Sequence, residues 1–362
     1  MDASTTSSTA SSTDADALMA FALKSIDDIA AGYTGVMVSL GSKLGLYKAL
    51  AGAGPLSARE VAARSGCAGR YVREWLNSQA AAGYVGYHAV SDTYELSPAQ
   101  AAVLADEDSP FFIPHAWNVP ASMWFDEARS LEAFRTGRGV AWGEHHERMS
   151  CGSAAFYRNG YKASLVPQWL PALDGVVEQL AAGIHVADVG CGHGHSTLLM
   201  AEAFPASRFH GFDTHAASIA EAGSLAHRAG LRDRVRFDLA RATDYPDGQY
   251  GLICFFDVLH DLGDPVAAAR HAARTLAPGG TVMLVEPFAN DRVEDNAGTV
   301  GRLFYSASAL ICCAHAISEG GTLVLGAQAG PARLQDVFRH AGFTHFREAA
   351  RTPFNLVFEV RR

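Results

Sequence analysis

The segment VADVGCGHGHST, residues 186–197, most restricts the folds open to this chain. An apolar run, HVADVG, leads into it, and STLLMAEAF continues after it with the composition of a helix, so the glycines stand between a buried strand and a helix. Gly190, Gly192 and Gly194 alternate with larger residues, which leaves bare backbone where the chain must turn sharply and meet a ligand. The helix that follows offers unpaired N–H groups. The pattern therefore predicts a nucleotide-binding loop.

The spacing within this loop separates two kinds of nucleotide site. A dinucleotide fingerprint, G-x-G-x-x-G, needs a third glycine where this chain has His195. The chain instead has G-x-G-x-G after Asp188, and a second strand, FHGFD, ends in Asp213, placed to accept hydrogen bonds from ribose hydroxyls. A metal site in the loop is disfavoured because ligands at alternating positions of a tight turn would have to converge from opposite directions. We therefore expect no metal.

Composition and charge limit the other functional classes. A chain of 362 residues, 49% apolar, is expected to form two domains. The formal charge of −9 disfavours a non-specific hold on nucleic acid. Residues 1–17 are Ser/Thr-rich with no features of a targeting signal, so we expect a disordered tail and a cytoplasmic protein. The longest apolar segment, residues 303–317, is expected to be too short for a bilayer, and the six cysteines form no CxxC pair.

The amino-terminal third has the pattern of a winged helix. Ser57 precedes Glu60 by three residues, the signature of a capping box, and Gly66 closes that helix. Residues 69–82 form a second amphipathic segment, followed by two short alternating runs, YVGYH and TYELS. The second segment offers only Arg70 and Arg73 to a phosphate backbone. A packing or dimerisation role is therefore favoured over DNA binding. Further along, the segment WGEHHERMS is expected to be a half-exposed turn between domains.

The ordered segments of the second half resemble those of class I S-adenosylmethionine-dependent methyltransferases. VADVGCGHG with Asp213 resembles motif I and the acidic position after it, and DRVRF resembles the third strand. YGLICFFDVLHDLGDP is similar to the fourth strand with its motif, LAPGGTVMLVEP to the turn and fifth strand, and residues 332–360 to the last helix and closing strand pair. With the winged helix, the order over residues 25–362 resembles a bacterial family of small-molecule methyltransferases.

This resemblance implies an α/β fold, a Rossmann-like seven-stranded class I methyltransferase sheet with an amino-terminal, mostly helical winged-helix domain. The expected divisions are a tail (1–17), a winged-helix or dimerisation domain (18–110), a helical linker and substrate-covering region (111–182) and an S-adenosylmethionine-binding methyltransferase domain (183–362) with a substrate-lid insertion (288–330). The expected partners are a small-molecule substrate and a second copy of the chain in a homodimer. Neither nucleic acid nor a membrane is expected as a partner.

The resemblance also assigns cofactor contacts. The three glycines of the loop would carry the methionine part of S-adenosylmethionine, Asp188 would lie near its amino group, and Asp213 would hold the ribose. Phe256 and Asp257, at the end of the fourth strand, fall where the family lines the methionine side. In the family, an acidic residue followed by a small residue after the third strand often binds the adenine amino group. This chain has Arg241 there, so we expect backbone groups to contact adenine instead.

The chemistry expected is O-methylation of a small, largely apolar molecule. His260 in VLHDLGDP is the candidate general base, since imidazole titrates near neutral pH and this segment lies at the carboxyl edge of the sheet. It resembles the histidine of the LHDW motif in winged-helix O-methyltransferases, with Leu262 in place of tryptophan, and a packing role is the alternative. Glu286 is a possible second acid. The candidate substrate residues are Tyr157, Phe304, Tyr305 and His315.

Two other functions stay open at this point. One is C-methylation of a prenyl diphosphate or similar metabolite, which would require Mg²⁺ and a basic diphosphate clamp. The other is a non-catalytic regulator that senses S-adenosylmethionine and uses the winged helix on DNA. Cys312 and Cys313 are expected to act as small hydrophobic residues.

Overall fold

The computed structural model describes residues 7–362, with side chains described from residue 14 onward. The chain divides into two compact units, one ending at Trp117 and one running from Asn118 to Arg362. Part of the expected linker region, from residue 118 to residue 182, therefore belongs to the same unit as the sheet.

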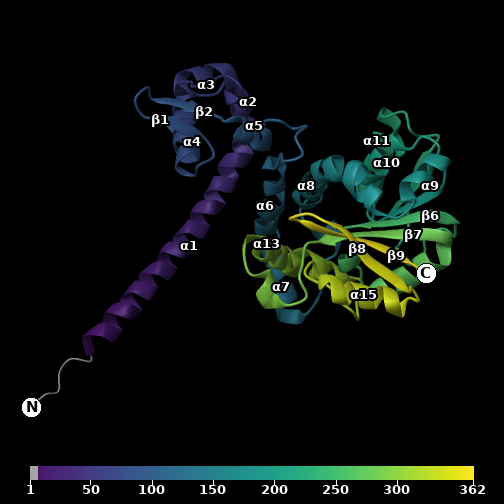
Figure 1. Cartoon of the computed structure of the whole chain (residues 1–362). Coiled ribbons are helices and arrows are strands. Elements are labelled where there is room, and N and C mark those ends of the chain that lie inside the picture. Colours follow the sequence, from purple (N-terminus) through teal and green to yellow (C-terminus); the bar gives the residue numbers. More distant parts are fainter. Residues whose placement is uncertain (1–6) are drawn as a thin grey trace, which may run out of the picture. The chain divides into compact units, whose positions relative to one another are not determined.

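The first unit is mostly helical (Figure 1). Its helices are α1 (Ser7–Lys43), α2 (Leu46–Leu50), α3 (Ala58–Ser65), α4 (Gly69–Ala81) and α5 (Pro98–Leu104), and its strands are β1 (Gly86–His88) and β2 (Thr93–Glu95). The predicted capping box is present, because the Ser57 hydroxyl accepts from the Glu60 N–H while the Glu60 carboxylate accepts from the Ser57 N–H. β1 and β2 pair antiparallel as the predicted hairpin. The winged-helix prediction is confirmed.

The expected disordered tail over residues 1–17 differs from the structure. Residues 1–6 lie outside the described part of the chain, and α1 begins at Ser7. Extending an existing helix adds a hydrogen bond for each residue without a new nucleation cost, so a Ser/Thr/Ala-rich sequence can continue a helix that apolar residues begin. All described side chains from residue 14 to residue 33 of α1 are exposed, including Phe21 and Tyr33.

The second unit is built on a seven-stranded sheet in the order β5-β4-β3-β6-β7-β9-β8. The five strands from β5 to β7 are parallel, and β9 and β8 close the sheet with antiparallel pairs. The strands are β3 (His185–Val189), β4 (Arg208–Asp213), β5 (Val235–Leu239), β6 (Tyr250–Phe256), β7 (Leu276–Pro287), β8 (His345–Arg351) and β9 (Asn355–Arg361). This is the sheet that the resemblance implies.

Helices cover both faces of this sheet. The helices of the second unit are α6 (Asn118–Phe125), α7 (Glu127–Thr136), α8 (Arg148–Ser164), α9 (Val176–Ala182), α10 (His195–Ala203), α11 (Ala216–Arg228), α12 (Pro265–Thr275), α13 (Thr299–Ala307), α14 (Cys313–Ser318) and α15 (Gly330–His340). Alternate residues of β6 enter different cores: Ile253 packs with residues of α12 and α15, whereas Cys254 packs with residues of α9 and α10. Because both faces are covered, the ligand site is confined to the edge where the parallel strands end.

The helical run over Thr299–Ser318 is longer than the sequence suggested. The structure joins α13, a π-helical turn (Ser308–Cys312) and α14 into one helical run of 20 residues with a mean hydropathy of 1.4. A run of this length can cross a bilayer, so the expectation that the segment is too short to do so is wrong. One such helix is weak evidence for a membrane span, since core helices pass the same test. Here Phe304, Ile311 and Cys312 are buried in a core with Met149 and Ala327.

Candidate functional site

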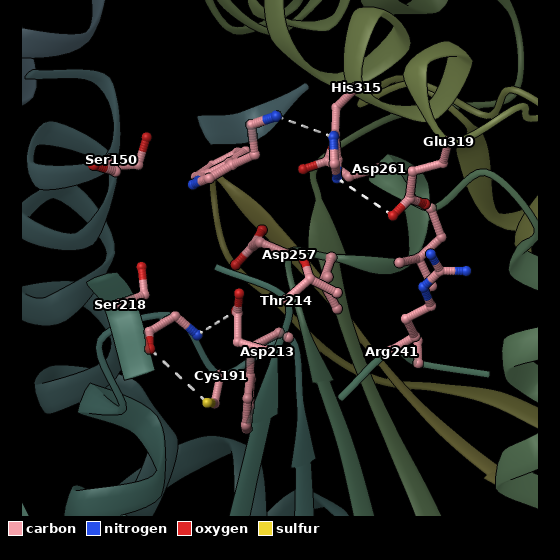
Figure 2. Close-up of a pocket in the computed structure, with 18 of the residues that line it drawn as sticks. Ser150, Cys191, Asp213, Thr214, Ser218, Arg241, Asp257, Asp261, His315 and Glu319 are labelled. Carbon is pink, nitrogen blue, oxygen red and sulfur yellow. Dashed lines mark hydrogen bonds and ion pairs between the residues drawn. The ribbon is translucent and has the colours of Figure 1, made fainter. Parts of the chain in front are cut away.

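A cavity of about 690 Å³ opens at the carboxyl ends of the parallel strands (Figure 2). One side, which we call the loop side, is lined by residues from segments 190–196, 213–218 and 240–243, which follow β3, β4 and β5. The opposite side, which we call the helix side, is lined by Ala141, Trp142, residues of α8, segment 261–264 and residues between His315 and Thr322. Residues 256–258, at the end of β6 and directly after it, also line the cavity.

The glycine loop follows β3 as predicted and needs glycine at three positions. Gly190, Gly192 and Gly194 have φ values of 75°, 52° and 75°, in the left-handed region that other residues rarely adopt. A Cβ at Gly190 would lie 2.3 Å from the Val258 side chain, and one at Gly194 would lie 2.5 Å from Phe237. Gly190 and Gly192 line the cavity. Gly194 packs toward β5 and precedes α10, so its role is to let the loop approach the sheet closely.

Asp213 holds the glycine loop from the neighbouring strand. Its Oδ2 accepts from the Gly192 N–H at 2.9 Å, and its Oδ1 accepts from the His215 N–H at 2.8 Å. The first of these contacts is visible in Figure 2, where the carboxylate of Asp213 faces the cavity. Asp213 therefore ties the end of β4 to the loop after β3 and also lines the predicted cofactor site.

Asp188 lies beneath the loop and is fully buried. Its Oδ2 accepts hydrogen bonds from the Ser196 hydroxyl (2.7 Å) and the Thr197 hydroxyl (2.5 Å), both in the first turn of α10. Its Oδ1 has no hydrogen-bond partner among the described residues. Burial raises the pKa of this carboxyl to about 6, although the two hydroxyls act in the opposite direction. An unpartnered carboxylate oxygen under a glycine loop suits a cationic group of a ligand.

Phe256 ends β6 and Asp257 follows it directly, where the resemblance placed them, and both line the cavity. Asp257 has a φ of 53°, an uncommon conformation outside glycine that aspartate tolerates better than most residues. Its Oδ2 accepts from the Tyr161 hydroxyl at 2.9 Å, and its Oδ1 accepts from the Asn355 amide at 2.8 Å. Burial, together with the charge of Glu286, raises the pKa of Asp257 to about 8. This carboxyl is thus held in one orientation toward the cavity.

His260 lies in a buried polar cluster directly behind the cavity wall. Its Nδ1 is 2.5 Å from Glu286 Oε2, while Glu286 Oε1 accepts from the Leu259 N–H at 3.0 Å. Its Nε2 lies 3.2 Å from Asp261 Oδ1, which has no partner with hydrogen-bond geometry. Asp261 borders the cavity, whereas His260 does not. Burial by itself lowers the pKa of His260, but the carboxylates of Asp261 and Glu286 outweigh it and raise that pKa well above its usual range.

The same cluster brings Cys312 close to His260 and Asp261, with their potential ligand atoms all within 4.8 Å of one another. Sequence spacing could not show this triad, because Cys312 comes from the helical run, far along the chain from the other two residues. Burial raises the pKa of the Cys312 thiol to about 12, so it is a thiol rather than a thiolate at neutral pH. The expected absence of a metal stays a prediction.

The helix side of the cavity joins segments that lie far apart in the sequence. The Val140 N–H donates to the Ala314 carbonyl at 2.9 Å, and the Trp142 N–H donates to His315 Nδ1 at 3.2 Å. A Cβ at Gly139 would lie 2.1 Å from the Ser318 nitrogen, so only glycine allows this approach. On the other side of its ring, His315 Nε2 lies 3.8 Å from Glu319 Oε1, and Figure 2 shows these two side chains next to each other.

The structure separates the predicted substrate residues. Tyr157 and His315 line the cavity. Phe304 does not line it, because its side chain packs into the core around Met149, and Tyr305 is 37% exposed and also lies outside the cavity wall. The apolar run could not reveal which face of its helix meets the cavity, since only the end near His315 does so.

Sequence reasoning also missed parts of the cavity wall. Trp142 lies in WGEHHERMS, which the sequence suggested is a half-exposed turn between domains, but this segment lies inside the second unit. His145 there is buried, with Nδ1 3.1 Å from Asp126 Oδ2, which also accepts from the His146 N–H. Ser150, Ser153 and Glu319 line the cavity without any sequence signal. The low apolar periodicity of these segments hid their role.

Comparison with known proteins agrees with this geometry. The family model of the Rv2258c-like winged HTH domain matches residues 32–106, and that of the methyltransferase domain matches residues 161–325. The 27-O-demethylrifamycin SV methyltransferase of Amycolatopsis mediterranei (strain S699) is 34% identical over 107 residues, which are 29% of this chain and 39% of that protein. The chain thus matches well under half the length of this curated relative.

Solved structures share the fold over nearly the whole chain. Human N-acetylserotonin methyltransferase in complex with S-adenosylmethionine has a TM-score of 0.70 at 17% identity, covering 94% of this chain and 97% of its own. An O-methyltransferase from neocarzinostatin biosynthesis, with S-adenosylmethionine and 2-hydroxy-5-methyl naphthoic acid, has a TM-score of 0.60 at 19% identity, covering 91% and 95%. The chain has the class I methyltransferase fold. It matches an Rv2258c-like winged HTH domain followed by a methyltransferase domain, so the predicted fold and the predicted order of the two domains are confirmed.

The residues of the loop side fit S-adenosylmethionine. The glycine positions leave backbone open to the cavity, since a Cβ at Gly192 would meet no atom within 4 Å. Asp213 lines the cavity and presents a carboxylate at the position expected for ribose, whereas Asp188, expected near the amino group, is buried beneath the loop with an unpartnered Oδ1 and does not line the cavity. Arg241 lines the cavity beside Ala240 and Ala242, so backbone groups of this segment could make the adenine contact predicted from the sequence.

Proposed function

We propose that this protein is an S-adenosylmethionine-dependent O-methyltransferase that acts on a small molecule. The observation that carries the proposal is one cavity that has the glycine loop and Asp213 on its loop side and Asp261 on its helix side, with His260 and Glu286 buried behind Asp261. Asp188, the loop glycines, Asp213, Phe256 and Asp257 would hold the cofactor on the loop side, and the acceptor would lie against the helix side.

The bound cofactor would supply a methyl group on a sulfonium, which is already activated for transfer. The protein's contribution is to align the acceptor, exclude water and remove a proton. We assign proton removal to His260, acting through Asp261, because Asp261 borders the cavity and its Oδ1 lies 3.2 Å from His260 Nε2. The proton leaves the acceptor hydroxyl as its oxygen forms the bond to the methyl carbon, and it ends on Nε2. Glu286 holds the opposite ring nitrogen and stabilises the imidazolium.

The two alternative functions lack a supporting feature in the described residues 7–362. A diphosphate clamp needs basic side chains, yet the helix side of the cavity presents neither Lys nor Arg among those residues. A DNA-reading role for α4 would rest on Arg70 and Arg73, but Arg70 pairs with Glu74, and Arg73 lies 2.7 Å from Asp92. Both cations are already neutralised within the first unit.

Calorimetric titration of the purified protein, with no added metal, tests the proposed function. S-adenosylhomocysteine should bind with micromolar affinity, while NADH should not bind, because the loop lacks the third glycine of a dinucleotide site. Binding of NADH alone would contradict the proposal, and so would binding of neither compound.

We also propose that the protein is a homodimer that pairs through α1. Apolar side chains stand exposed along this helix, among them Phe21 (69% exposed) and Ile29 (63%), and exposed apolar stretches of this extent mark interaction surfaces. The Phe21→Asp/Ile29→Asp double variant should sediment as a monomer where the unmodified chain sediments as a dimer. Val90→Asp, a change of another fully exposed apolar residue in the first unit, is the control and should stay dimeric. A monomeric unmodified chain would refute the pairing through α1.

The cytoplasmic location expected from the sequence stays a prediction.

A further inference from the structure

The cluster behind the cavity wall contains three kinds of metal ligand. His260, Asp261 and Cys312 are all buried, and their potential ligand atoms lie within 4.8 Å of one another. Around a tetrahedral Zn²⁺, whose bonds to nitrogen and sulfur are about 2.0–2.3 Å long, ligand atoms stand roughly 3.3–3.7 Å apart. The three side chains therefore need only small shifts to meet one ion. The loop histidines, His193 and His195, belong to no such group in the described part of the chain.

The contact between His260 and Asp261 leaves a buried carboxylate oxygen without a directed partner. Nε2 and Oδ1 are 3.2 Å apart and attract each other by charge. Oδ1 nevertheless has no partner with hydrogen-bond geometry among the described residues. A buried polar atom without a hydrogen bond is costly. An ion that takes the place of the ring proton on Nε2 would bind both atoms and remove this cost.

Glu286 holds His260 in the way that metal-binding histidines are usually held. Its Oε2 is 2.5 Å from His260 Nδ1, and its Oε1 accepts from the Leu259 N–H at 3.0 Å, so the carboxylate itself is fixed. A histidine that ligates a metal generally donates its other ring N–H to a carboxylate or a carbonyl, which sets the orientation of the ring. Nε2 is thus the nitrogen left to bind an ion together with Asp261 and Cys312.

Cys312 comes from an irregular turn of the helical run over Thr299–Ser318. Ser308–Cys312 form a π-helical turn, in which the Cys313 N–H donates to the Ser308 carbonyl five residues back. Single π-helical turns inside α-helices are rare, and they occur frequently at functional sites. The proposed methyl transfer makes no use of the Cys312 thiol. This turn therefore places beside His260 a sulfur ligand that still lacks a function.

From these contacts we propose that His260, Asp261 and Cys312 form a binding site for a thiophilic divalent cation such as Zn²⁺. Thiolate and imidazole ligands select such an ion over Mg²⁺ and Ca²⁺, which prefer oxygen ligands. Three protein ligands leave a fourth position for water, and Asp261 borders the cavity, from which the ion can enter. On binding, the protons of the thiol and of Nε2 pass to solvent. The site replaces the expectation of no metal, which came from the glycine loop.

An ion at this site and proton removal by His260 exclude each other, because both need the lone pair of Nε2. Zn²⁺ is therefore an inhibitor of the proposed methyl transfer, and a chelator restores the activity. This consequence rests on the proposed function. The binding of the ion does not, since it requires only the three side chains and can be measured without cofactor or acceptor.

Co²⁺ is the probe for the site, because it accepts the same ligands as Zn²⁺ and its bond to a thiolate gives an intense charge-transfer absorption in the near ultraviolet. The full chain is reduced, freed of metal with a chelator and titrated with Co²⁺. We expect the thiolate band to grow until one ion is bound per chain. Zn²⁺ should then remove the band by displacing Co²⁺, because this kind of site binds Zn²⁺ more tightly, whereas Mg²⁺ should leave it unchanged.

Two variants assign the band to the cluster. Cys312→Ala should abolish it, because the sulfur ligand is gone. Asp261→Asn keeps the shape of the side chain and should weaken Zn²⁺ binding in calorimetry by at least about tenfold, so it tests the site even where Cys312→Ala fails to fold. Cys313→Ser is the matched control, since Cys313 is the next residue and its sulfur lies 3.4 Å from the Ser308 hydroxyl. Its band should equal that of the unmodified chain.

Four results would each overturn the site: no thiolate band in the unmodified chain, a band that persists in Cys312→Ala, a band lost in Cys313→Ser, or unchanged Zn²⁺ affinity in Asp261→Asn. Binding of S-adenosylhomocysteine to the same metal-free samples is measured separately. A failure of the cofactor site would therefore count against the proposed function, and a failure of Co²⁺ binding would count against the metal site alone.

Discussion

Replacing His260 with alanine should lower kcat by about 10²- to 10⁴-fold, the range that a positioned general base contributes. Its ring is the group in the cluster that can take up the acceptor's proton while Glu286 stabilises the charge that results. The affinity for S-adenosylhomocysteine should stay the same, because His260 does not line the cavity. Steady-state kinetics and calorimetry on the same preparation measure both quantities.

The pH dependence gives a second readout for His260. A base acts in its neutral form, and the carboxylates of Asp261 and Glu286, which outweigh the effect of burial, raise the pKa of His260 well above that of free histidine. The rate should therefore rise with pH through this raised pKa, with no plateau near the ordinary histidine value. Glu286→Gln removes one of these charges and should move the rise toward lower pH. His340→Ala changes an exposed residue of α15 and serves as the control. A His260→Ala enzyme with unchanged turnover would exclude His260 as the general base.

Replacing Asp213 with alanine should weaken S-adenosylhomocysteine binding by about 1.5 to 3 kcal/mol, the value of a hydrogen bond to a charged group, or about 10- to 150-fold in Kd. The Asp213 carboxylate faces the cavity, where it can contact the ligand, and it also accepts hydrogen bonds from the Gly192 and His215 N–H groups, which fixes the loop. Its loss affects both the ligand contact and the shape of the loop.

Asp213→Asn separates these two contributions. The amide oxygen still accepts one backbone hydrogen bond but lacks the charge, so an intermediate loss of affinity assigns part of the effect to the ribose contact. Asp233→Ala, an exposed change in the turn before β5, is the control and should bind normally. Normal binding by Asp213→Ala would mean that the ribose is held elsewhere.

The loop side could be predicted from the sequence because its determinants are local. The strand, the three glycines and the helix follow one another within residues 185–203, and Asp213 ends the next strand in register with β3. Alternating glycines between a strand and a helix have few structural explanations, so the pattern alone predicted a nucleotide-binding loop. The closing strand pair was expected from the resemblance to class I methyltransferases rather than from a local pattern, since β8 (HFREAAR) is neither continuously apolar nor alternating.

The helix side could not be predicted because its residues meet only in the folded chain. Trp142 and His315 are joined by one hydrogen bond, from the Trp142 N–H to the His315 imidazole, across 173 residues of sequence. The apolar pattern of the 299–318 run fits a lid, a core helix and a membrane span equally well, and it led to Phe304 and Tyr305 instead of Glu319. His260 was found by its place after β6, but its burial behind Asp261 depends on Glu286 and Cys312, which come from other segments.

The contact of Gly139 and Val140 with α14 has a consequence for how acceptor specificity can diverge. Neither segment can be exchanged alone, because any side chain at Gly139 collides with the Ser318 backbone, and a shifted α14 would leave the Val140 N–H without its acceptor. Related enzymes should therefore inherit residues 139–142 and 314–320 as a matched pair. A chimaera that transplants both should acquire the donor's acceptor range, whereas one that transplants either alone should lose activity toward both sets of acceptors.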